Sequence, residues 1–108
     1  MKSALSVEIA VLSKAFRQAG EGLGLDDTEL SAVLGEPVSK LKPGTEAWSQ
    51  ALIFVELYQG LLAVVGNEQS ARIWLSSENH ALGGRPRDLI ACRTGLEQIV
   101  KYLASSRP

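Results

Sequence analysis

Apolar residues recur every three or four positions along most of this chain, which is the spacing of one face of an α-helix. The first such stretch covers residues 5–19, and we expect its helix to end in the glycine-rich segment 20–24. Asp26 is followed three residues later by Glu29, and this capping-box pattern predicts a second, short helix that stops at Gly35.

The longest periodic stretch predicts a helix from Thr45, a good N-cap, to about Val65. Its apolar residues form two stripes, which is typical of a helix that is central in a fold or shared with a partner. One stripe comprises Ala51, Val55, Tyr58, Leu62 and Val65, and the other comprises Phe54, Leu57, Leu61 and Val64. We expect the helix to be central, and we place Phe54, Leu57 and Leu61 near the interface of a homodimer.

Three shorter helices are expected after the central one. Asn67 is the expected N-cap of the first, which carries Trp74 as a core residue, and a turn covers residues 79–84. Pro86 suits the first turn of the next helix, and Thr94 begins the last one through a capping box with Glu97. The predicted fold is all-α, with roughly six or seven helices and no sheet.

A turn at Lys42-Pro43-Gly44 divides the predicted helices into two parts, residues 1–44 and residues 45–108. The last four residues, from Ser105 to Pro108, have no apolar periodicity and are expected to form a short mobile tail.

The composition is that of a soluble globular protein, with 108 residues, 45% apolar and 21% charged. A formal net charge of −1 argues against a strongly basic nucleic-acid-binding coat. Cys92 and His80 are single residues of their types and cannot supply a His/Cys zinc site, so no metal or cofactor is expected. The lone cysteine suits a reducing compartment, and no uninterrupted apolar stretch reaches the roughly 20 residues of a membrane span. We expect a cytoplasmic protein, with Cys92 as a small buried side chain.

The polar residues of the C-terminal part raise the alternative that the protein is an enzyme. Glu78, His80 and Asp88 could be imagined as an acid–base set around the Gly83-Gly84 turn. The spacing supplies no nucleophile, metal site or phosphate cradle, and the glycine pair follows no strand as a dinucleotide fingerprint would require. The sequence therefore favours a binding protein over an enzyme.

The C-terminal part carries a distinctive series of short motifs. A Trp74-Leu75 pair is followed by Asn79, by the turn Leu82-Gly83-Gly84-Arg85-Pro86, by Asp88-Leu89-Ile90 and by Gly95-Leu96. The order and spacing resemble the toxin-binding domain of the Xre/MbcA/ParS antitoxin family over about residues 45–103. In that family the domain is all-helical and binds a RES-domain toxin, which destroys cellular NAD or modifies proteins with it.

The resemblance implies that this chain is an antitoxin of a type II toxin–antitoxin system with a RES-type toxin as its partner. Arginines on the C-terminal part are expected to meet acidic rims of the toxin, and the C-terminal tail is expected to reach its NAD cleft. The candidate toxin contacts are Arg72, Glu78, Asn79, His80, Gly83, Gly84, Arg85, Pro86, Arg87, Arg93, Ser105, Ser106 and Arg107.

The same resemblance implies an Xre-like helix-turn-helix in the N-terminal part, but the second helix of that motif is about three residues too short here. Ser39, Lys40 and Lys42 are the candidate DNA contacts, yet residues 1–44 hold slightly more acidic than basic side chains. Specific operator binding is therefore expected to be weak or absent. A free-standing helix-turn-helix regulator without a toxin partner is the alternative function.

Overall fold

The computed structural model describes residues 4–106 and has six α-helices and one 3₁₀ turn, with no strand among those residues. The helices are α1 (Ala4–Gly22), α2 (Asp27–Leu34), α3 (Glu46–Val65), α4 (Glu68–Ser76), α5 (Pro86–Leu89) and α6 (Arg93–Ser106), and the 3₁₀ turn η1 is Val38–Lys40. The predicted all-α fold is confirmed.

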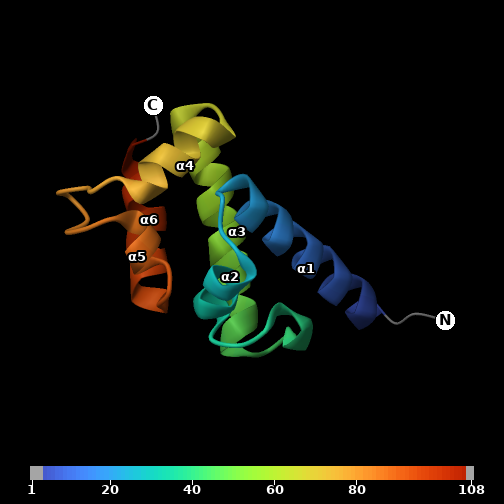
Figure 1. Cartoon of the computed structure of the whole chain (residues 1–108). Helices are drawn as coiled ribbons and strands as arrows, with labels where there is room; N and C mark the ends of the chain where they lie inside the picture. The colour runs from blue at the N-terminus through green and yellow to red at the C-terminus, as the bar shows by residue number, and fades with distance from the viewer. Residues whose placement is uncertain (1–3, 107–108) are drawn as a thin grey trace.

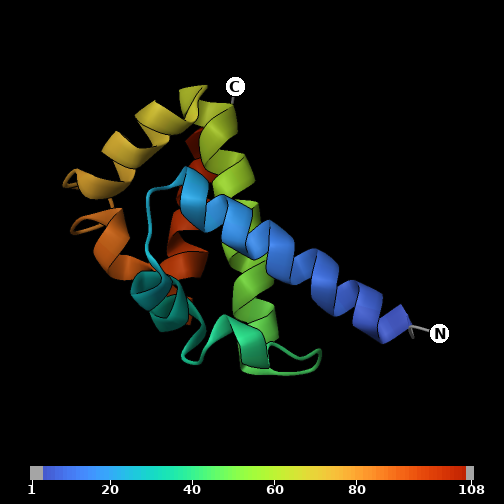
Figure 2. The ribbon, with the colours of Figure 1, turned by 45° about the vertical axis from the view of Figure 1, so that its right-hand side comes forward.

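Helix α3 lies in the middle of the molecule, as the two apolar stripes predicted. It packs most extensively against α6 and also contacts α1, α2 and α4 (Figure 1). The N-terminal half of α1 extends beyond the other helices in both ribbon views (Figures 1 and 2), and the molecule is elongated, with extents of 48 × 24 × 23 Å.

Three of the predicted N-caps are confirmed. Asp26 and Glu29 form a reciprocal capping box at α2, Thr45 accepts from the backbone of Trp48 at α3, and Asn67 caps α4. These caps satisfy backbone N–H groups that would otherwise lack a partner at each helix start.

The predicted cap of the last helix is wrong. Helix α6 begins at Arg93, one residue before Thr94, and the N-cap position falls on Cys92. The sulfur of Cys92 accepts a hydrogen bond from Gly95 N at 3.4 Å, and Glu97 pairs with Arg93 instead of closing a capping box. Cys92 is exposed rather than buried as predicted.

The glycines after the first helix have different roles from the one predicted. Gly20 and Gly22 lie within α1, and only Gly24 has the left-handed backbone, with φ of 74°. A Cβ on Gly20 would overlap the side chain of Leu30, so this glycine lets α2 approach α1 closely.

One hydrophobic core joins the N-terminal helices to α3. Phe16 of α1 packs against Phe54 of α3 with ring centroids 5.0 Å apart. Leu57 and Leu61 are also fully buried by this chain's own helices. The prediction that Phe54, Leu57 and Leu61 lie at a dimer interface is therefore wrong, because the other helices of the chain already cover these three side chains.

Among the described residues, α3 is a helix long and apolar enough, by length and composition alone, to cross a membrane. The core helix of a globular protein passes the same test, and α3 is packed on several sides by other helices of the chain. Its buried Gln50 donates a hydrogen bond to the Val33 carbonyl of α2. We interpret α3 as a core helix.

Candidate functional site

A tight loop between α4 and α5 contains six of the thirteen predicted contact residues, and it projects from the side of the molecule in Figure 1. Asn79 organises it. Its backbone N–H donates to Gly84 O at 3.0 Å and its carbonyl accepts from Gly84 N at 3.2 Å, while its side-chain oxygen accepts from Leu82 N at 3.3 Å. Gly83 has φ of 80°, which favours glycine, and Leu82 is buried beneath the loop.

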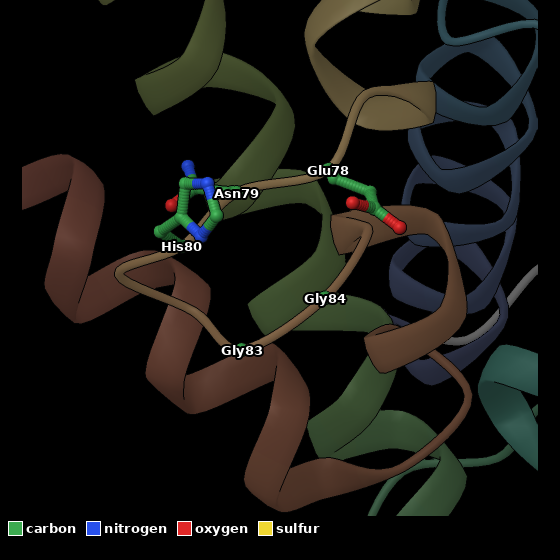
Figure 3. A pocket seen from close by; sticks show the side chains of 5 residues that line it. All are labelled: Glu78, Asn79, His80, Gly83 and Gly84. Atoms are coloured by element: carbon green, nitrogen blue, oxygen red, sulfur yellow. The ribbon is translucent and has the colours of Figure 1, made fainter.

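An open pocket on this loop is lined by Glu78, Asn79, His80, Gly83 and Gly84 (Figure 3). The loop therefore brings together five of the predicted contact residues. The side chain of Glu78 points away from those of Asn79 and His80, and Glu78 and His80 each retain access to solvent.

The third member of the imagined acid–base set is held elsewhere. Asp88 accepts from Arg85 Nε at 3.0 Å, at the start of α5. The side chains of Glu78 and His80 point in different directions (Figure 3) and Asp88 is paired with Arg85, so the three do not form one acid–base set. Among residues 4–106, no three His, Cys, Asp or Glu side chains gather as a metal site requires.

The predicted arginine cluster is paired with carboxylates of the chain itself. Arg93 donates to Glu97 at 2.7 Å and to Glu46 at 2.9 Å, and these carboxylates, Glu97 first, raise the pKa of its guanidinium. Arg85 is bonded to Asp88. The arginines expected to present free positive charge to the toxin are thus exposed but paired with carboxylates of this chain.

Arg87 and Arg72 connect the C-terminal part to the N-terminal part. Arg87 makes a two-bond contact with Glu29, at 2.7 Å for both Nε–Oε2 and Nη2–Oε1, and also donates to Gly24 O at 3.2 Å. Arg72 Nε donates to Gly22 O at 3.0 Å. Arg87 therefore anchors α5 to the capping box of α2.

The ionisation of the Glu29–Arg87 pair follows from this geometry. The hydrogen bonds from Arg87 lower the pKa of the Glu29 carboxyl, against a smaller opposing effect of burial, and the Asp26 backbone N–H lowers it further. In turn, the Glu29 carboxylate raises the pKa of Arg87. Both side chains are about one-third exposed, so the ion pair is partly shielded from water.

The end of α6 differs from the predicted mobile tail. Ser105 and Ser106 are helical and exposed, and both hydroxyls donate to the Tyr102 carbonyl, at 2.9 and 3.0 Å. Arg107, the last predicted toxin contact, lies outside the described residues. Pro86, another predicted contact, is fully buried, because as the first residue of α5 it packs into the core.

Trp74 is not a fully buried core residue as expected. It is half-buried and stacks on Tyr102 of α6, with ring centroids 6.3 Å apart and the planes 24° from parallel. The neighbouring Ile73 is 62% exposed. Ile73 and Tyr102 were not predicted as functional residues, because a single apolar residue outside the buried face of a helix makes no periodic pattern. The position of Ile73 on a different face of the helix from Ala71 and Leu75 was the sequence feature that could have identified it.

The N-terminal candidates lie on a short turn rather than on a recognition helix. After α2 ends at Gly35, the chain forms only the three-residue turn η1 before α3. Ser39, Lys40 and Lys42 are exposed on or beside it. The described residues therefore contain no second helix of a helix-turn-helix between α2 and α3.

Fold and site together define an all-helical protein whose exposed polar groups lie on a structured loop and a helix end. Residues 61–107 match the family described as the antitoxin Xre/MbcA/ParS C-terminal toxin-binding domain. The C-terminal part of this chain is therefore similar to an antitoxin-type toxin-binding domain, as the order of its motifs implied. No curated protein sequence matches the chain.

Proposed function

We propose that this chain is a cytoplasmic antitoxin that neutralises a RES-domain toxin by binding it directly. The observation that carries this proposal is the match of residues 61–107, which span the end of α3 and all of α4, α5 and α6, to an antitoxin toxin-binding domain. Glu78, His80 and Asp88 do not form one acid–base set, which favours binding over catalysis as the way it acts.

The two parts of the chain have different roles in this proposal. Residues 45–108 carry toxin binding, and residues 1–44 supply helices that cover α3 and hold α5 through Arg87. Glu78, Asn79, His80 and Gly83 on the α4–α5 loop, together with Ser105, Ser106 and the following Arg107, are the contacts we propose. Arg72, Arg85, Arg87 and Arg93 act mainly by holding the framework, because each already bonds to a group of this chain.

The end of α6 is the segment we propose to enter the toxin's active-site cleft. A toxin that uses NAD must accommodate its phosphates, so its cleft attracts negative charge. The exposed hydroxyls of Ser105 and Ser106 carry no positive charge, so the end of α6 suits such a cleft better than a cluster of arginines does.

A homodimer remains part of the proposal, with a surface other than Phe54, Leu57 and Leu61. An apolar groove between α1 and α3 is lined by Val7, Val11, Trp48 and Leu52, and three of these are at least half exposed. It lies outside residues 61–107, so a second copy can cover it while the toxin-binding part stays accessible.

Operator binding is proposed to be weak or absent in the isolated protein. The turn η1 offers no helix for the major groove, and Lys40 and Lys42 are the basic side chains nearest to it. A free-standing transcriptional regulator would need this turn to read DNA by itself, so we rank that function second.

The test is co-expression with a RES-domain toxin. Toxin alone should arrest growth and lower cellular NAD, and the full-length chain should restore both and co-purify with the toxin. His80→Ala should weaken rescue, whereas Lys40→Ala, a substitution on the surface of the N-terminal part, should rescue like the wild type. Continued NAD loss despite folded, abundant full-length chain would contradict the proposal.

A further inference from the structure

An apolar patch, formed by the exposed Ile73 and the half-buried Trp74 and Tyr102, lies where α4 meets α6. Ile73 is 62% exposed, which only Val11 matches among the large apolar side chains described. Ala71 and Leu75, its neighbours on α4, are fully buried, so Ile73 lies on the opposite side of the helix from the core. The fold gives Ile73 no packing role.

The stacked pair beside Ile73 has the chemistry of a protein contact. Trp74 and Tyr102 are held against each other, so little side-chain freedom is lost when a partner covers them. Within the described part of the chain, neither the indole N–H nor the phenol hydroxyl has a hydrogen-bond partner in the protein. Aromatic residues with a polar tip available are enriched at the centres of protein interfaces.

We propose that the Ile73–Trp74–Tyr102 patch is the apolar centre of the toxin interface. This inference rests on the proposed function and names the surface that supplies its affinity. The patch lies wholly within residues 61–107, the part that matches a toxin-binding domain, and it is separate from the α1–α3 groove. The occupant is therefore the toxin and not a second copy of this chain.

The position of the patch also connects the two proposed contact regions. Tyr102 lies one helical turn before Ser106, whose hydroxyl donates to the Tyr102 carbonyl at 3.0 Å, so the end of α6 continues from the patch. Helix α4, which carries Ile73 and Trp74, leads directly into the loop around Asn79. A toxin seated on the patch can thus contact the loop on one side and the end of α6 on the other.

The test measures the affinity of the full-length chain for a catalytically inactive RES-domain toxin by isothermal titration calorimetry. Ile73→Glu places a charge at the patch and should weaken binding at least about 30-fold, as expected for a hot spot. Tyr102→Ala should weaken it by a similar factor. Ala10→Glu is the control, because Ala10 is exposed on α1 and does not line the α1–α3 groove, and its binding should stay within about threefold of wild type.

The outcomes separate this inference from the proposed function. No binding by the wild-type chain contradicts the proposed function itself. If the wild-type chain binds and the affinities of Ile73→Glu and Tyr102→Ala stay within about threefold of the wild-type affinity, only the assignment of the patch is overturned. The assignment is also overturned if these variants become monomeric with unchanged toxin affinity, because the patch would then be a contact between two copies. Thermal unfolding of each variant checks that the fold is retained.

Discussion

At the scale of single residues, Arg87 is the side chain with the most widespread contacts in the C-terminal part. Its guanidinium bonds to Glu29, to Gly24 O and to Ser76 Oγ, and so it joins α5 to α2, the α1–α2 loop and α4. A planar guanidinium can hold a carboxylate through two parallel bonds, which a lysine cannot do. Arg87 therefore acts as a brace for the α4–α5 loop.

Replacing Arg87 should destabilise the fold without removing any apolar contact of the core. We expect Arg87→Ala to lower the free energy of unfolding by about 1.5–3 kcal/mol, the usual range for hydrogen bonds to charged groups. Urea denaturation followed by circular dichroism measures this. Arg85→Ala, which loses an exposed ion pair, is the control and should change stability by less than about 1 kcal/mol. Equal losses of stability for Arg87→Ala and Arg85→Ala would show that the contacts of Arg87 do not hold these helices together.

The same ion pair makes stability depend on pH. The pKa of Glu29 is lower in the folded chain than in the unfolded chain. The Glu29–Arg87 pair therefore stabilises the fold fully at pH values above the ordinary glutamate pKa of about 4.3. This stabilisation is lost as the pH falls through the pKa that Glu29 has in the folded chain. We expect the stability difference between wild type and Glu29→Gln to be largest near pH 7 and to shrink below about pH 4. Thermal unfolding over this pH range checks it; a difference that grows in acid would contradict it.

At the scale of elements, the contact of α5 with α6 depends on a missing side chain. A Cβ on Gly95 would overlap the carbonyl oxygen of Leu89, which belongs to the backbone and cannot move aside. This explains why a glycine occupies the first turn of α6, where it costs about 1 kcal/mol of helix stability relative to alanine. The close approach of α5 and α6 at Gly95 therefore outweighs the low helix propensity of glycine.

Gly95→Ala should therefore destabilise the protein although alanine is the better helix former. We expect a net loss of about 1–2 kcal/mol, because overpacking commonly costs about 1–3 kcal/mol and helix propensity returns part of it. Gly84→Ala is the control, because a Cβ there meets nothing within 4 Å and the backbone is not left-handed. A higher melting temperature for Gly95→Ala would contradict the close contact.

The end of α6 allows folding and neutralisation to be separated. Leu103 is buried, whereas Ala104, Ser105 and Ser106 are exposed. We expect deletion of residues 104–108 to change stability by less than about 1 kcal/mol, since the described residues that it removes, 104–106, are exposed, and yet to weaken rescue of toxin-expressing cells. Melting temperature and growth under co-expression are measured together. Full rescue by the truncated chain would show that the end of α6 is not part of the toxin interface.

At the scale of the whole molecule, α1 makes the protein elongated and leaves an apolar groove uncovered. Val7, Val11 and Leu52 are 51%, 63% and 50% exposed around one groove, an unusual gathering for a small monomer. The N-terminal half of α1 extends past the other helices, where a second copy can pack against it (Figure 2).

This arrangement predicts a dimer that a single charge disrupts. The wild-type chain should sediment as a dimer at micromolar concentration, and Val11→Glu should sediment as a monomer because it would bury an unpaired carboxylate. Ile73→Glu, with nearly equal exposure but in the C-terminal part, should stay dimeric. A monomeric wild type at high micromolar concentration would contradict the proposed use of the groove.

The sequence by itself determined the features that depend on neighbours within about four residues. Periodicity of apolar positions located the helices, and the side chains of Asp26, Thr45 and Asn67 located three of their starts, because a cap needs only a polar oxygen near the next turn. The motifs between Trp74 and Leu96 also indicated the toxin-binding family, because their order and spacing are properties of the sequence alone.

Only the tertiary structure decided which groups meet across the fold. Both stripes of α3 looked alike in sequence, and the packing of the surrounding helices decided that Phe54, Leu57 and Leu61 are internal. Arg87 finds Glu29 58 residues away, a pairing that no local spacing encodes. Long-range contacts depend on how helices cross and which side chains they enclose, so burial, ion pairing and the exposure of Ile73 emerge only when the helices are assembled.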